Sequence, residues 1–84
     1  MELKHQFRRQ ENVLAMHSIV ELVGQGRLLI ENHQGVLSYA TKEIKVKVSY
    51  GCIIVTGSDL QLMEMSRVKL AICGRIYELQ ILGR

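Results

Sequence analysis

Glu43-Ile-Lys-Val-Lys-Val-Ser-Tyr50 is the stretch of sequence that decides the fold class. Its apolar side chains Ile44, Val46 and Val48 occupy every second position, as does Tyr50, and polar residues stand between them. Successive side chains of a strand point to opposite faces of a sheet, so this spacing predicts a strand with one buried and one exposed face. A helix would scatter the lysines around its axis, and we therefore predict a strand here.

The same alternation extends outward along the chain from residue 18. Residues 67–72 repeat it, with Val68, Leu70 and Ile72 expected to point inward. We expect strands near residues 18–23, 27–31, 36–40, 43–50, 52–56, 60–65, 67–73 and 75–82. Short strands at this spacing predict an all-β domain, a small antiparallel meander that forms a barrel, a sandwich or a compact solenoid.

Glycines separate the expected strands, and glycine adopts a positive φ without steric penalty. We expect turns or bulges at Gly24, Gly26, Gly35, Gly51, Gly57 and Gly74. Tyr50-Gly51 and Thr56–Asp59 resemble tight hairpin connections, and Glu31–Gly35 resembles a longer one.

The chain has 84 residues and no proline, which predicts one domain. We expect a basic segment at residues 1–16, either a short amphipathic helix or a frayed tail, followed by a single β domain at residues 17–84. A chain of this size has a marginal core, so self-association into a homo-oligomer or docking to a partner would help it. No apolar run reaches the roughly 20 residues of a membrane-spanning helix, which favours a cytoplasmic location, either free or peripheral to the membrane.

The net charge of +3 arises from 11 basic and 8 acidic residues that no single segment concentrates. A small β-barrel that binds nucleic acid is the alternative class of function. Such a module needs basic residues interleaved with stacking aromatics, and the aromatic residues here are Phe7, Tyr39, Tyr50 and Tyr77. We therefore do not expect nucleic acid to be the partner.

The residues that could carry catalysis or bind a metal are dispersed. His5, His17 and His33 form no HxH or HxxxH pair, and Cys52 and Cys73 form no CxxC motif. No glycine-rich loop has the lysine-serine or lysine-threonine ending of a phosphate-binding motif. We expect reduced thiols packed like small apolar groups, no metal, no cofactor and no enzymatic activity.

Two groups of residues are candidates for binding a partner. Glu31, Asn32, His33 and Gln34 form the densest polar cluster and could be a recognition loop, although Asn32 could equally occupy a left-handed turn conformation. Met63 and Met65 are expected on the strand face opposite Leu60 and Leu62, unless a bulge intervenes. A strand that is apolar on both faces is either central in a sandwich or covered by another chain.

Three sequence blocks resemble the YabP/YqfC family of sporulation proteins, and its YqfC branch most closely. They are Leu28–Tyr39 with its Ile-Glu-Asn-His sequence, Gly51–Leu60, and Ile72-Cys-Gly-Arg-Ile76. The matching residues are Ile30 to His33, Gly35, Gly51, Gly57, Leu60, Gly74, Arg75 and Ile76. The resemblance covers about residues 17–82, whereas the segment before Met16 and the cysteine at position 73 depart from the family pattern.

The resemblance implies a protein of the mother cell of an endospore-forming bacterium, required for proper spore formation and without enzymatic activity. YqfC-type proteins are associated with a membrane protein of the same sporulation programme. The resemblance therefore implies docking to a membrane partner.

Overall fold

Six antiparallel strands form one sheet in the computed structural model, which describes residues 17–24 and 26–83. The strands are β1 (Ile19–Val23), β2 (Arg27–Glu31), β3 (Val36–Tyr39), β4 (Glu43–Val48), β5 (Gly51–Met65) and β6 (Lys69–Gly83). Their order in the sheet is β1-β2-β6-β5-β4-β3. The prediction of an all-β antiparallel domain is confirmed, and the helix considered for the N-terminal segment lies outside the described residues.

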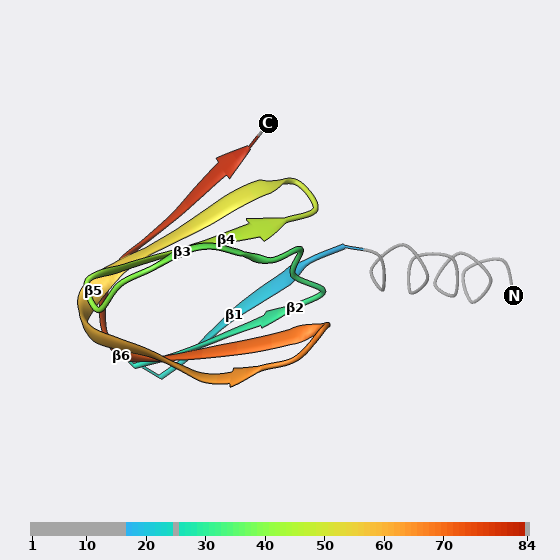
Figure 1. Ribbon diagram of the computed structural model, residues 1–84. Helices are drawn as coiled ribbons and strands as arrows, with labels where there is room; N and C mark the ends of the chain where they lie inside the picture. The colour runs from blue at the N-terminus through green and yellow to red at the C-terminus, as the bar shows by residue number, and fades with distance from the viewer. Residues whose placement is uncertain (1–16, 25, 84) are drawn as a thin grey trace, which may run out of the picture.

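The sheet turns back on itself through its two longest strands and is not closed (Figure 1). One layer consists of β1, β2, the beginning of β6 and the end of β5, side by side in that order. The other layer consists of β3, β4, the beginning of β5 and the end of β6, side by side in that order. We call these the β1–β2 layer and the β3–β4 layer. Because β1 and β3 do not pair with each other, the fold is not a closed barrel, and the layers pack as in a sandwich.

The bend lies where two glycines let the β5 and β6 backbones approach each other closely. A Cβ atom on Gly57 would stand 1.8 Å from the carbonyl oxygen of Arg75, and one on Gly74 would stand 2.6 Å from that of Asp59. Gly74 and Asp59 also have positive φ angles of 138° and 54°. The hairpin predicted at Thr56–Asp59 is therefore wrong, because these glycines permit close backbone contact within continuous strands. Of the two alternatives predicted for Gly57, a turn or a bulge, the bulge is confirmed, since the register shifts between Thr56 and Gly57.

The core lies between the two layers and takes apolar side chains from both. Its fully buried members are Leu28, Ile30, Ile44, Val46, Val48, Ile53, Val55, Leu60, Leu70 and Ile72. Complete burial of an aliphatic side chain of this size contributes about 1.5–3 kcal/mol. The predicted register of β4 is confirmed, since its three apolar residues are buried and Lys47 is exposed. Val68, predicted to point inward, is 51% exposed because it lies in the turn between β5 and β6.

Two connections complete the fold. The tight connection expected before Gly51 is confirmed, because Val48 pairs directly with Gly51 across a two-residue turn. The hairpin expected at Glu31–Gly35 is wrong, because β2 and β3 are not neighbours in the sheet. This segment instead crosses from the β1–β2 layer to the β3–β4 layer. No helix in residues 17–24 and 26–83 is long and apolar enough to cross a membrane.

Candidate interaction surface

Asn32 fixes the backbone of the polar loop predicted as a recognition element. It adopts the left-handed conformation, with a φ of 60°. Its backbone N–H donates to the carbonyl oxygen of Val68 at 2.5 Å, and its side-chain Nδ2 donates to that of His17 at 2.9 Å. Its own carbonyl accepts a hydrogen bond from Ser18 Oγ at 2.6 Å. The alternative role considered for Asn32, a left-handed turn residue, is confirmed.

His33 joins this loop to the turn between β5 and β6. Its Nδ1 accepts a hydrogen bond from the backbone N–H of Gly35 at 3.1 Å. The neutral ring with this acceptor carries its hydrogen on Nε2, which therefore donates to the carbonyl oxygen of Ser66 at 2.8 Å. Both ring nitrogens are thus engaged within the chain.

The loop also binds β4 in the opposite layer. The backbone N–H of Gln34 donates to the carbonyl oxygen of Lys47 at 2.7 Å, and the N–H of Lys47 donates to that of Gly35 at 2.8 Å. We call residues Glu31–Gly35 the clasp loop, because they connect the two layers. Glu31 forms an ion pair with Lys69 at 3.9 Å between exposed side chains, an interaction typically worth less than about 1 kcal/mol.

Met63 and Met65 lie on a free edge of the sheet. β4 pairs with β5 only as far as Thr56, so Gln61–Met65 pairs with β6 on one side and with no described strand on the other. The side chains of Met63 and Met65 are 60% and 59% exposed. We call Gln61–Met65 the methionine edge.

A bulge at Met63 changes the expected facing of the methionines. Leu62 and Met65 pair with Ile72 and Leu70, both of which are buried in the core, and the register shifts between these pairs. Met65 therefore shares a face with Leu62. The exception allowed in the prediction, an intervening bulge, therefore applies to Met65, because the extra residue reverses the alternation.

The structure brings the two predicted groups to the same end of the β1–β2 layer. Glu31 pairs with Lys69 across β2 and β6, and Met65 pairs with Leu70 across β6 and β5. The clasp loop and the methionine edge therefore flank the β5–β6 turn. Of the predicted loop residues, Glu31 and Gln34 are the most exposed, whereas Asn32 and His33 are half-buried.

A second free edge was not predicted from the sequence. β2 pairs with β6 only as far as Cys73, so no described strand pairs with the outer side of Arg75–Gly83. Tyr77, Ile81 and Leu82 are 68%, 56% and 42% exposed. The signal in the sequence was the dense apolar content of Ile76–Leu82, which exceeds what one buried face requires.

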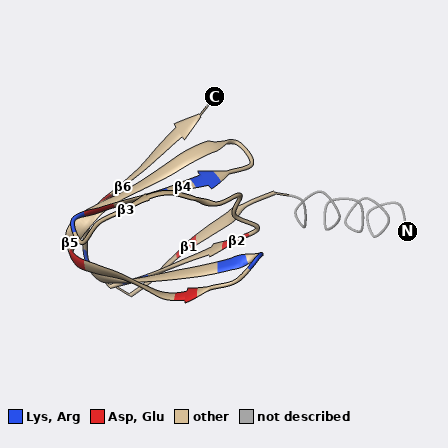
Figure 2. Ribbon diagram, viewed as in Figure 1, with Lys and Arg blue, Asp and Glu red and all other residues tan. Residues whose placement is uncertain are grey.

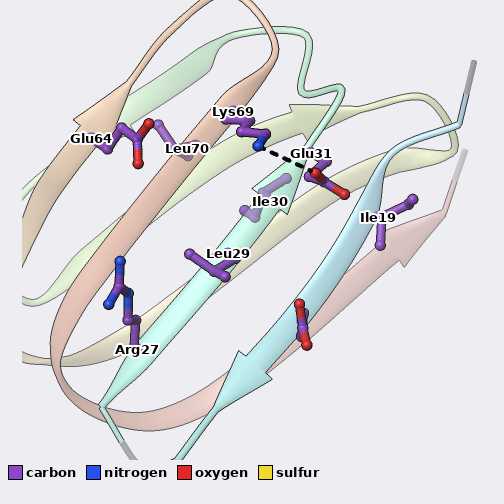
Figure 3. Close-up of a pocket in the computed structure, with 9 residues that line it drawn as sticks. Ile19, Arg27, Leu29, Ile30, Glu31, Glu64, Lys69 and Leu70 are labelled. Atoms are coloured by element: carbon purple, nitrogen blue, oxygen red, sulfur yellow. Dashed lines mark ion pairs between the residues drawn. The ribbon is translucent and has the colours of Figure 1, made fainter. Parts of the chain in front are cut away.

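A hollow of about 230 Å³ lies on the outer face of the β1–β2 layer (Figure 3). Leu29 lies in it, and the charged side chains around it are Glu21, Arg27, Glu31, Glu64 and Lys69. Opposite charges stand close together here, as the ion pair in Figure 3 shows. No group of three or more His, Cys, Asp or Glu side chains among residues 17–24 and 26–83 could hold a metal ion.

The described charges do not concentrate in one region. Figure 2 shows basic and acidic positions dispersed over different strands of both layers. Cys52 and Cys73 are free thiols, and both are half-buried. The exposed apolar side chains on unpaired strand edges are therefore the feature of this surface that most favours contact with another protein.

The fold and its surface define a small antiparallel β protein with open, partly apolar sheet edges. Residues 15–84 match the YabP family, so the chain belongs to this family. The match includes all six strands, and membership agrees with a role in sporulation. Neither the comparison with curated proteins nor that with solved structures found a match.

Proposed function

We propose that this protein is a non-enzymatic sporulation protein of the YqfC branch, which acts in the mother cell by docking to a membrane protein of the sporulation programme. The family match and the three sequence blocks support the role in sporulation. It would be cytoplasmic and would associate with the membrane through this partner.

The exposed methionine edge is the observation that carries the docking proposal. Met63 and Met65 present flexible apolar side chains on a strand that lacks one neighbour. A partner segment could add a strand here, with main-chain hydrogen bonds providing affinity and the methionine side chains adapting to its surface. The clasp loop holds the adjacent turn in place through His33.

Deletion of the gene tests the biological role. We expect fewer mature spores with normal vegetative growth. An unchanged spore count would contradict the role in sporulation.

A pull-down from sporulating cells with solubilised membranes tests the docking surface. The wild-type protein should retain a membrane protein, and Met63→Lys with Met65→Lys should reduce that retention at least about tenfold, because buried charge opposes docking. Leu37→Lys is the matched control, since Leu37 is 58% exposed on β3. Equal retention by the double variant and the control would remove the methionine edge from the proposal.

A further inference from the structure

Arg75–Gly83 of β6 is an unpaired edge with exposed apolar side chains. Sheet edges of this kind are usually protected by lysine, proline or a charge that points inward. This segment contains no lysine and no proline, and its inward residues include Leu79 and Ile81, which pair with Val55 and Ile53 of the core face. It is therefore a template for another strand.

The hydrogen bonds of Lys47 show which way the backbone groups of β4 and β5 point. Both its N–H and its carbonyl group bond to the clasp loop and so point away from β5. Backbone groups of successive strand residues point to alternate sides, so those of Val46 point towards its partner Ile53, and those of Ile53 point back. The backbone N–H and carbonyl groups of the neighbouring residue Ile54 must then point towards β6.

The same alternation continues into β6. Ile54 pairs with Gln80, so the backbone groups of Gln80 point towards β5. Those of Leu79 and Ile81 consequently point outward. Both residues present N–H and carbonyl groups to the unpaired edge, where they are available to a strand from another molecule.

The other edges are less suited to pairing with themselves. β1 has five residues, and self-pairing around its central residue Glu21 would place two carboxylates opposite each other. β3 has four residues and a register shift after Val36. The methionine edge has five residues and is interrupted by the bulge at Met63, whereas the register shift of β6 at Tyr77 leaves Glu78–Gly83 regular.

We propose that a second copy of this chain binds along Arg75–Gly83, with its own β6 running antiparallel about a twofold axis at Leu79. Leu79 of each copy would exchange two backbone hydrogen bonds with Leu79 of the other, because its groups point outward. Glu78 would face Gln80 of the second copy, and Ile81 would lie near Tyr77, where β6 carries a register shift relative to β5. The two β3–β4 layers would then form one continuous sheet across the dimer.

Charge favours this register over its neighbours. A twofold axis at Glu78 would place Glu78 opposite itself, which is destabilising. An axis at Gln80 would place the carboxylate of Glu78 opposite the apolar side chain of Leu82. The axis at Leu79 opposes no like charges, and its central pairs, Leu79 with Leu79 and Glu78 with Gln80, lie outside the register shift at Tyr77. A closed twofold interface also ends growth at the dimer.

The oligomeric state of the full chain tests this proposal independently of the role in sporulation. Sedimentation of the wild-type protein should give a dimer, twice the chain mass of 9.6 kDa. Ile81→Lys should weaken dimerisation at least about tenfold, because it introduces a charge beside the paired edge. Leu37→Lys, at nearly equal exposure on β3, should leave the dimer intact. Far-ultraviolet circular dichroism should show that both variants are folded.

A disulfide cross-link tests the register. Paired residues that exchange hydrogen bonds have Cα atoms about 5.5 Å apart, within the range of a disulfide. Oxidised Leu79→Cys should therefore yield a covalent dimer, whereas Leu37→Cys, which retains the same native thiols, should not. A monomeric wild-type protein, growth beyond the dimer, equal effects of the two lysine variants, or no cross-link specific to Leu79→Cys would overturn the proposal.

Discussion

β4 and the end of β6 belong to the same layer and are both rich in apolar residues, yet their burial differs sharply. Ile44, Val46 and Val48 of β4 are fully buried. In β6, Tyr77 and Ile81 are more than half exposed. β4 has a neighbour on each side, β3 and β5, whereas Arg75–Gly83 has β5 alone. Figure 1 shows this end of β6 at the margin of the fold.

The difference shows that an inward-facing apolar side chain of this protein is fully buried only where its strand has a neighbour on each side. An isoleucine in β4 stabilises the folded chain, whereas an isoleucine at the end of β6 remains accessible to another molecule. The comparison predicts that the loss of stability caused by a substitution is largest between the two layers and smallest on an exposed face.

The largest effect is expected from Val46→Asp. The new carboxylate would be buried among aliphatic side chains without a basic partner, which costs several kcal/mol. A domain of this size has a total stability of only about 5 kcal/mol, so the variant should be largely unfolded. Circular dichroism with urea titration measures this. A cooperative transition near that of the wild type would show that the β4 face is less enclosed than the structure indicates.

Gly57→Ala should have the next largest effect, because Gly57 lies at the bend of the two long strands, where the β5 and β6 backbones are in close contact. Its added methyl would overlap the Arg75 carbonyl oxygen in the backbone of β6, and separating the strands should cost about 3 kcal/mol. Thermal unfolding measures the change.

Gly24→Ala is the control for Gly57→Ala, because it replaces a glycine by alanine at a position where the added methyl overlaps no other atom. Gly24 has a φ of 65°, and a Cβ there would meet nothing within 4 Å. Its loss should be about 1 kcal/mol, the typical cost of a left-handed conformation for alanine. Equal losses at Gly57 and Gly24 would mean that close strand contact does not maintain the bend.

Residue pattern predicted the parts of this fold that depend on local geometry. The alternation in residues 43–50 gave both the strand and its buried face, since the period of two is a property of the strand itself. For Gly57 and Gly74 the sequence left a turn and a bulge both open, because a glycine that permits close strand contact has the same sequence signature as a turn glycine.

The candidate surface was only partly predictable. The left-handed conformation of Asn32 was predicted as one of two alternatives. The hydrogen-bond partners of Asn32 and His33 lie on distant segments, so the contacts of these two residues could not be read from the sequence. The bulge at Met63 reverses a pattern that has no local marker. The free edge of β6 depends on strand order, which pairs β6 with β2 for only part of its length.

His33→Ala should destabilise the domain by about 1–2 kcal/mol, because it removes two hydrogen bonds and leaves the partially buried N–H of Gly35 unpaired. Gln34→Ala is the matched control in the same loop, and its exposed side chain should contribute less than about 0.5 kcal/mol. Chemical denaturation distinguishes the two. If both changes leave stability intact and His33→Ala instead abolishes partner capture, the clasp loop is a recognition element.

Lys47→Asp should have the smallest effect, although residue 47 is adjacent to Val46 on the same strand. Its side chain lies on the outer face and is exposed, so the substitution should change the free energy of unfolding by no more than about 0.5 kcal/mol. Lys45→Asp should likewise stay near this limit, with the larger loss of the two because Lys45 is half-buried beside Ile54. Urea titrations of both variants and of Val46→Asp, measured together, test the facing of β4 directly. Losses at the lysines as large as that at Val46 would require a register shifted by one residue, which would turn the lysine face towards the core and the valine face towards solvent.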